Sequence, residues 1–172
     1  AASDFVTAVE DAADECEGSE TAVATVGKLD VDPNAPNVIP GRVTLTMDVR
    51  AVDHGDIEAI IRATRDALAD ICAARPVDAT LEHTWDRPPV SMADRCRLAL
   101  HDAAAHAGVA SLDLHSGAGH DTMHVAGVTD AALLFAPSRG GISHSPHEWT
   151  DWTDCGATTA VLAGALADLA SE

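Results

Sequence analysis

Histidines are concentrated in one part of the sequence, and a short stretch there could do chemistry. Of nine histidines in 172 residues, five lie within residues 115–147. Residues 116–124 place small side chains before His120 and Asp121, so that a ligand could approach the backbone closely. His120 and His124 have the spacing of a metal clip on one helix, although no glutamate accompanies them. A simple turn capped by His120 is the alternative interpretation.

A second stretch, residues 137–149, follows an apolar segment that is predicted to be a strand. Loops at strand ends are where α/β proteins place their sites. His144 offers an imidazole there, and Glu148 is a nearby carboxylate. A metal-bound histidine needs such a partner to fix its tautomer. His144 is therefore a candidate metal ligand, although its spacing alone does not establish that role.

Two polar residues in the first half of the chain could contact a small molecule. Arg50 lies on the polar face of a predicted strand, and its guanidinium can hold a carboxylate through two charge-assisted hydrogen bonds. A surface ion pair with Asp48 is the alternative for Arg50. Asn37 lies in a Pro-rich loop, where an Asx-turn explains its presence equally well.

The first 88 residues show hydrophobic periodicity in the order helix, strand, strand, helix, strand. Gly18 ends the first helix, Asp53 caps the second, and Thr64 interrupts the apolar stripe of that second helix. This order is a ferredoxin-like βαββαβ sheet without its opening strand, so the chain is expected to begin inside a domain. The predicted elements span residues 5–16, 21–31, 43–50, 53–75 and 77–85.

A Pro-Pro pair at residues 88–89 marks a linker, and the second part of the chain follows it. Its first helix is expected to be capped by Ser91 with Asp94 and followed by Gly108 in the C′ position. The whole chain is predicted to be α/β (α+β). The elements of the second part are predicted over residues 91–106, 131–136 and 153–170.

Composition and charge exclude several classes of protein. Hydrophobic residues make up 47%, which is typical of a globular chain. Ten Lys and Arg against 28 Asp and Glu give a net charge of −18, which repels phosphate backbones and excludes nucleic acid as a partner. No apolar run is long enough for a membrane span, and no secretory signal is recognisable. Four scattered cysteines are too few for a disulfide scaffold or a zinc ribbon.

The acidity is spread along the chain rather than gathered in a tail. Tyrosine is absent and Lys28 is the single lysine. We interpret these features as those of a halophilic protein from a salt-rich cytoplasm, where salt screens the self-repulsion. An ordinary acidic protein from a GC-rich genome is the alternative.

Three stretches of the sequence together resemble one family. Residues 37–50 begin with Asn-Val-Ile-Pro-Gly and end with Asp-Val-Arg, residues 117–121 read Gly-Ala-Gly-His-Asp, and residues 140–146 read Gly-Gly-Ile-Ser-His-Ser-Pro. They resemble signatures of the hydantoinase/carbamoylase branch of the M20 metallopeptidase-like amidohydrolases. That branch includes N-carbamoyl-L-amino-acid hydrolases, allantoate amidohydrolases and β-ureidopropionases. The resemblance covers essentially the whole chain, with the three stretches in the family's order.

This resemblance implies a two-part enzyme. A catalytic α/β domain holds a two-metal site, usually with zinc and in some members with manganese, and an inserted βαββαβ lid makes a homodimer contact. Residues 1–88 would be the lid without its first strand, and residues 89–172 the C-terminal part of the catalytic domain.

The resemblance also assigns roles to individual residues. His144 would be the last metal ligand. Asn37 and Arg50 would bind the carboxylate and amide of the substrate. Gly119 and His120 would line the pocket, and His120 would polarise or hydrogen-bond the scissile group.

The family's other metal ligands and its general-base glutamate have no counterpart in this sequence. One histidine cannot hold zinc, which needs three or four protein ligands. We therefore expect a C-terminal portion of a cytoplasmic enzyme that hydrolyses the C–N bond of N-carbamoyl or ureido groups, inactive by itself and completed by an N-terminal half. A non-catalytic dimerising module with an unpaired sheet edge is one alternative. Another M20 amidase or aminoacylase-like peptidase is a second.

Overall fold

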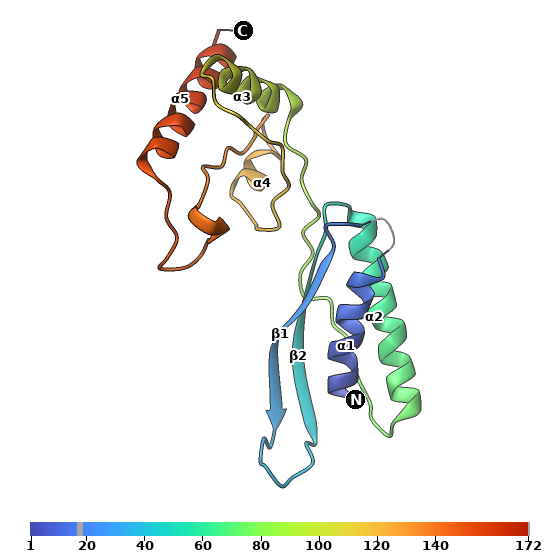
Figure 1. The fold of residues 1–172 in the computed structure, drawn as a ribbon. Helices are drawn as coiled ribbons and strands as arrows, with labels where there is room; N and C mark the ends of the chain where they lie inside the picture. Colours follow the sequence, from blue (N-terminus) through green and yellow to red (C-terminus); the bar gives the residue numbers. More distant parts are fainter. Residues whose placement is uncertain (17–18, 172) are drawn as a thin grey trace. The chain divides into compact units, whose positions relative to one another are not determined.

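The computed structural model describes residues 1–16 and 19–171 (Figure 1). Contacts between residues divide the chain into two compact units, Ala1–Pro89 and Val90–Glu172. Each unit forms around a pair of helices that bury small and branched apolar side chains against each other.

The described residues of the first unit form two helices and two strands. Both predicted helices and the first two predicted strands are confirmed, and Gly18 lies outside the described residues. The second helix ends before Pro76, as expected from the missing N–H of proline. The elements are α1 (Ala2–Asp14), β1 (Val23–Asp32), β2 (Arg42–Arg50) and α2 (His54–Ala74).

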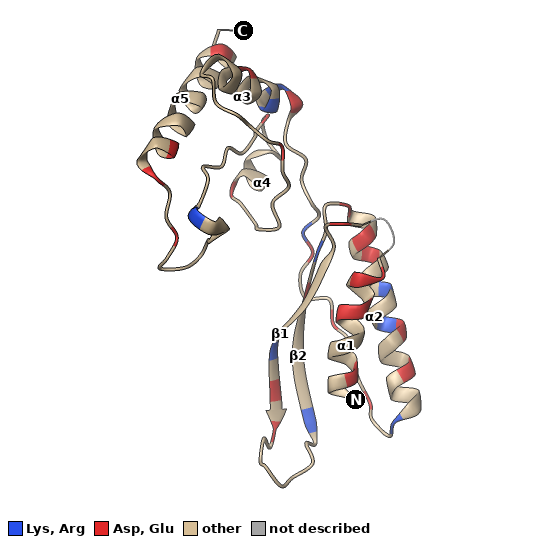
Figure 2. Cartoon of the chain, in the orientation of Figure 1, with Lys and Arg blue, Asp and Glu red and all other residues tan. Residues whose placement is uncertain are grey.

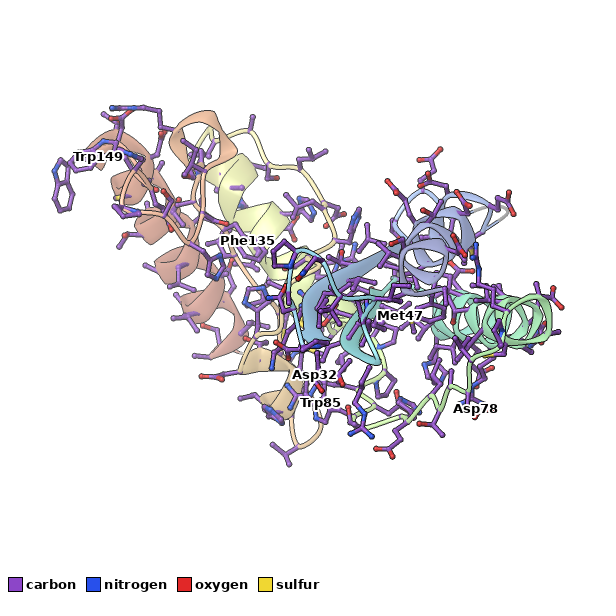
Figure 3. All side chains as sticks on the ribbon, turned by 90° about the horizontal axis from the view of Figure 1, so that it is seen from below. Asp32, Met47, Asp78, Trp85, Phe135 and Trp149 are labelled. Atoms are coloured by element: carbon purple, nitrogen blue, oxygen red, sulfur yellow. The ribbon has the colours of Figure 1, made fainter. Side chains whose placement is uncertain are left out.

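Strands β1 and β2 form an antiparallel hairpin. Its register runs from Val23 opposite Arg50 to Asp32 opposite Arg42, with a bulge at Gly27. Side chains along β2 alternate between half-buried and exposed, as the period of two predicted. Met47 is on the half-buried face, and Figure 3 shows it between the strands and the helices.

Helices α1 and α2 supply the buried side chains of the first unit. Asp53 caps α2 as predicted, because its carboxylate accepts the Gly55 N–H at 2.6 Å. Thr64 does not break the buried face of α2, since it is fully buried and its hydroxyl donates to the Ile61 carbonyl at 3.0 Å. The buried residues are Phe5, Val9, Ala13, Ile60 and Thr64.

The predicted strand at residues 77–85 is wrong. Within the described part of the chain the only sheet has two strands, and this segment is in neither. Val77 and Trp85 are 41% and 67% exposed. An alternating segment becomes a strand only beside a partner, and in a βαββαβ sheet the last strand lies beside the opening strand. No described residue supplies that opening strand.

The second unit is built on two packed helices. Helices α3 and α5 bury small side chains against each other, and a Cβ added at Gly164 would lie 3.2 Å from the Ala103 Cβ. Glycine at this position therefore lets the two helices approach closely. The elements are α3 (Asp94–His106), α4 (Thr122–Val125), the 3-10 turn η1 (Arg139–Gly141) and α5 (Trp152–Leu169).

The two ends of α3 differ in how well the sequence predicted them. The N-cap is Ala93 rather than Ser91, and it makes no side-chain cap bond. At the other end, Gly108 occupies the predicted C′ position with φ 67°, and the Val109 N–H donates to the Ala104 carbonyl at 2.9 Å.

The predicted strand at residues 131–136 is also wrong. The segment joins no ladder, and the Ala131 carbonyl accepts one hydrogen bond, from the Ala93 N–H at 2.9 Å. Leu134 packs against the core made by α3 and α5. The apolar character of this segment thus reflects packing on helices, because no neighbouring strand is present in the described part of the unit.

Charge is distributed over both units. Figure 2 shows aspartate and glutamate on helices, strands and loops rather than in a single segment. Among the described residues, no helix combines the length and the apolar character needed to cross a bilayer.

Candidate functional site

Arg50 is the last residue of β2, and its guanidinium forms a two-pronged ion pair with Asp48. Nε donates to Oδ1 at 2.6 Å and Nη2 donates to Oδ2 at 3.2 Å. This partner raises the pKa of Arg50. The structure thus contains the ion pair that was one interpretation of Arg50. It also shows the guanidinium holding a carboxylate on the exposed face of the strand, so any second carboxylate would have to compete with Asp48.

Asn37 lies in the exposed turn between β1 and β2, and backbone hydrogen bonds close that turn. Within residues 1–16 and 19–171 no hydrogen bond involves the Asn37 side chain, so the Asx-turn interpretation is not supported. The nine residues of β2 separate Arg42 from Arg50 by about 27 Å, at about 3.4 Å per residue. Asn37 lies beyond Arg42, so one small molecule cannot contact Asn37 and Arg50 of the same chain.

His120 is half-buried and has two neighbours that fix its ring. Its Nε2 lies 2.8 Å from the Ser116 Oγ, which also accepts the Ala118 N–H at 3.2 Å. The ring meets Phe135 edge-on, with ring centroids 5.5 Å apart. Ser116 and Phe135 thus hold the imidazole of His120 in one orientation. Neither contact was predicted, because Phe135 is far from His120 in sequence and the contact with Ser116 depends on the conformation of the loop.

The backbone beside His120 is open. A Cβ added at Gly119 would meet no atom within 4 Å, so the approach of a ligand to this backbone is unobstructed. His124 lies within α4, whereas His120 precedes that helix. The interpretation of these two histidines as a metal clip on one helix is therefore wrong.

His144 lies in the loop 138–151, where it adopts a left-handed backbone conformation with φ 55°. Residues 140–141, both glycine, have φ values of 67° and 69°. The Glu148 Oε2 accepts the backbone N–H of His144 at 2.9 Å, and the Ser143 Oγ lies 3.2 Å from the ring Nδ1. The carboxylate expected beside the ring thus contacts the backbone instead, and Ser143 is the neighbour of the ring.

A clamp of three residues joins the two ends of this loop. The Arg139 Nη2 and the Trp149 Nε1 both donate to the Asp151 Oδ1, at 2.8 and 2.9 Å, and the Arg139 N–H donates to the Trp149 carbonyl at 2.8 Å. The hydrogen bonds from Trp149 and Arg139 lower the pKa of the Asp151 carboxyl. This clamp was not predicted, because an ion pair across twelve residues follows no helical or strand period.

A second unpredicted set of contacts ties α3 to the segment after it. The Arg97 Nη2 and the His101 Nε2 lie 3.0 and 3.1 Å from the two carboxylate oxygens of Asp113, and both lower its pKa. The His101 Nδ1 lies 2.9 Å from the Ser111 Oγ. The i, i+4 spacing of Arg97 and His101 on one helix face is the signal that could have indicated this set.

A metal ion needs more donors than the described residues bring together. Throughout the described ranges 1–16 and 19–171, no group of three or more His, Cys, Asp and Glu side chains could hold a metal ion. His144 is a single donor, and zinc requires three or four. The described residues therefore do not by themselves fit a metal site.

Nearly the whole chain matches one known family. Residues 2–168 fit the family described as Peptidase family M20/M25/M40. The chain belongs to this family. All three stretches that carry the resemblance lie inside the matched residues, and the expected M20 relationship is confirmed.

Relatives of this M20 chain include named amidohydrolases. The N-carbamoyl-L-amino-acid amidohydrolase of Paenarthrobacter aurescens is 36% identical over 144 residues, which cover 84% of this chain and 35% of the relative. The allantoate amidohydrolase of Bacillus subtilis (strain 168) is 36% identical over 126 residues, covering 73% of this chain and 31% of the relative. The M20 chain thus spans about a third of the length of these curated relatives.

Solved structures show the same branch of the family. An amidase of the hydantoinase/carbamoylase family from Burkholderia multivorans is 35% identical with a TM-score of 0.86, over 95% of this chain and 39% of that one. The crystal structure of AtUAH in complex with glyoxylate has a TM-score of 0.89 at 27% identity, over 99% of this chain and 40% of that one. The mixed α/β fold class and the hydantoinase/carbamoylase relationship of the M20 chain are confirmed.

Proposed function

We propose that this chain is the C-terminal portion of a metal-dependent amidohydrolase that hydrolyses the C–N bond of N-carbamoyl or ureido groups. Its substrates would be small carboxylates such as N-carbamoyl-L-amino acids, allantoate or ureidopropionate. The observation that carries the proposal is the match of residues 2–168, with all three motif stretches, to a family whose relatives bear these amidohydrolase names. Residues 1–88 would be the lid and residues 89–172 the C-terminal part of the catalytic domain.

The side chains of this chain would grip and orient the substrate. Arg50 would exchange its Asp48 partner for the substrate carboxylate, keeping a two-pronged charge-assisted contact. Gly119 would leave room for the ureido group against the backbone. His120 would hydrogen-bond or polarise the scissile carbonyl, with its ring held by Ser116 and Phe135.

Asn37 and Arg50 of the same chain would bind two different substrate molecules. The two ends of β2, Arg42 and Arg50, are about 27 Å apart, and Asn37 lies in the turn beyond Arg42. In a homodimer made through the lid, each pocket can take Arg50 from one protomer and Asn37 from its partner. The dimer would then be a requirement for substrate binding.

The metal site would be completed by residues outside this chain. The proposed site binds two Zn²⁺ or Mn²⁺ ions, and His144 would be one ligand among several. Because the described residues hold no group of three donors, we expect residues 1–172 alone to be inactive.

The proposed activity can be tested on the full-length enzyme and on residues 1–172 alone. We expect the full-length enzyme, loaded with Zn²⁺ or Mn²⁺, to release ammonia from at least one of N-carbamoyl-L-alanine, allantoate and 3-ureidopropionate. Residues 1–172 alone should release none above a protein-free control. A stoichiometric metal with turnover by residues 1–172 would contradict the incomplete site. No turnover of any ureido acid by the loaded full-length enzyme would contradict the function.

One alternative has support in the hairpin. Among the described residues β2 pairs only with β1, so its second edge has no ladder partner, and such an edge can recruit a strand from another chain. A non-catalytic dimerising module would show a dimer by light scattering and no bound metal in the full-length protein. An aminoacylase-like M20 peptidase would instead hydrolyse N-acyl amino acids and leave ureido acids intact.

The acidic surface leads to a prediction about salt. With a net charge of −18 distributed over both units, self-repulsion is strong in dilute buffer and screened over about 3 Å at 1 M salt. We therefore propose a salt-rich cytoplasm as the setting of the protein and expect the thermal midpoint to rise from dilute buffer to molar KCl. Sucrose of equal osmolarity is the control. A midpoint that does not respond to KCl would contradict a halophilic protein.

A further inference from the structure

The backbone of His144 is in a conformation that its residue type rarely adopts. Its φ of 55° lies in the left-handed region, where a residue with a Cβ is strained. Such strain persists only where the surrounding contacts hold the residue in place. The contacts around His144 must therefore include one that fixes this conformation.

Glu148 makes that contact. Its Oε2 accepts the backbone N–H of His144 at 2.9 Å, which is a charge-assisted hydrogen bond across four residues. The backbone of Glu148 is itself held, because its N–H donates to the Ser145 carbonyl at 3.0 Å. The next residue, Trp149, is fixed by its two hydrogen-bonded contacts in the clamp with Arg139 and Asp151.

The carboxylate does not touch the imidazole. The ring Nδ1 of His144 lies beside Ser143, and its Nε2 makes no hydrogen bond with any described residue. Glu148 thus orients the residue through the main chain and leaves Nε2 open toward a ligand.

We propose that Glu148 is a positioning residue that holds the backbone of His144 in the left-handed conformation and so aims its ring. That the ring is oriented toward a metal ion rests on the proposed function, in which His144 is a metal ligand. The hold itself is a property of residues 1–172 and is measurable without metal.

The test uses NMR of the ¹⁵N-labelled chain, residues 1–172, with Glu148→Ala and Glu148→Gln. A left-handed residue has a short distance between its own amide and α protons, and therefore a strong cross-peak between them. In Glu148→Ala we expect this cross-peak at His144 to weaken and the amide to exchange about tenfold faster. Glu148→Gln keeps an acceptor oxygen and should largely restore both signals, which a loss of general stability would not do.

Asp168→Ala is the matched control, because it removes an exposed carboxylate from the same unit without a contact to this loop. It should leave both signals unchanged. Unchanged signals in Glu148→Ala, or equal changes in the control, would overturn the proposal. In the metal-loaded full-length enzyme, Glu148→Ala should lower metal occupancy and Glu148→Gln should recover it. If His144→Ala keeps full occupancy there, the ligand role fails while the NMR result still decides the role of Glu148.

Discussion

His144→Ala in the full-length enzyme is expected to lower metal affinity by at least about 10- to 100-fold, because even a hydrogen-bond partner of a metal ligand contributes that much. Turnover of the proposed ureido substrate should fall by about 100-fold or more, since a bound metal ion lowers the pKa of water from far above neutrality to about 7. Elemental analysis of the purified variant and calorimetric titration with Zn²⁺ measure the first effect. Initial rates of ammonia release measure the second.

His147→Ala is the matched control for this experiment. His147 lies in the same exposed loop, and its backbone N–H donates to the Ser145 Oγ at 3.3 Å. The substitution removes an imidazole three residues away and leaves the backbone contacts of His144 in place. We expect normal metal content and normal rates. Full metal occupancy in His144→Ala would show that His144 is not a ligand.

The helices of this protein were predictable because their signals are local. The Asp53 cap, the apolar stripe that includes Ile60 and the stop at Pro76 are all read from neighbouring residues, and the structure contains α2 where they place it. The hairpin was predictable for the same reason, since the alternation from Val43 to Val49 matches one half-buried face. In these segments the hydrophobic period of the sequence matches the helix or strand that the structure contains.

The two strands that were predicted but are not formed share one physical reason. Alternation at residues 77–85 and apolar character at residues 131–136 describe side chains, whereas a strand is defined by hydrogen bonds to a neighbour. No described residue offers that neighbour, so neither segment belongs to a ladder. A prediction from one segment cannot include the presence of its partner.

The candidate site shows the same limit. Sequence patterns indicated His120 and His144, but not Ser116 and Phe135 as the neighbours of His120. Glu148 was expected beside the ring of His144, whereas it contacts the backbone of that residue. These contacts depend on loop conformation, which has no period. The family resemblance also implied that Asn37 and Arg50 act together, while the extended rise of β2 separates them.

Arg50→Lys is expected to raise the KM for carboxylate substrates by about 10- to 100-fold in the full-length enzyme. Lysine keeps the charge but cannot reproduce the two-pronged contact, and one hydrogen bond to a charged group is worth about 1.5–3 kcal/mol. Arg42→Lys is the matched control, because Arg42 lies on the same exposed face at the other end of β2. Asp48→Asn should lower KM, since it weakens the competitor for the guanidinium of Arg50. An unchanged KM in Arg50→Lys would remove the carboxylate role.

Mixing two defective homodimers tests how Arg50 and Asn37 share a substrate. If each pocket takes Arg50 from one protomer and Asn37 from the other, a dimer of Arg50→Lys with Asn37→Ala contains one intact pocket and one with both defects. Random exchange makes half of the dimers mixed, so the rate below KM should recover to about a quarter of the wild-type rate. If both residues served one pocket of the same chain, mixing would give no recovery. The separation of Asn37 and Arg50 along β2 favours the first outcome, because no rotation of side chains spans about 27 Å.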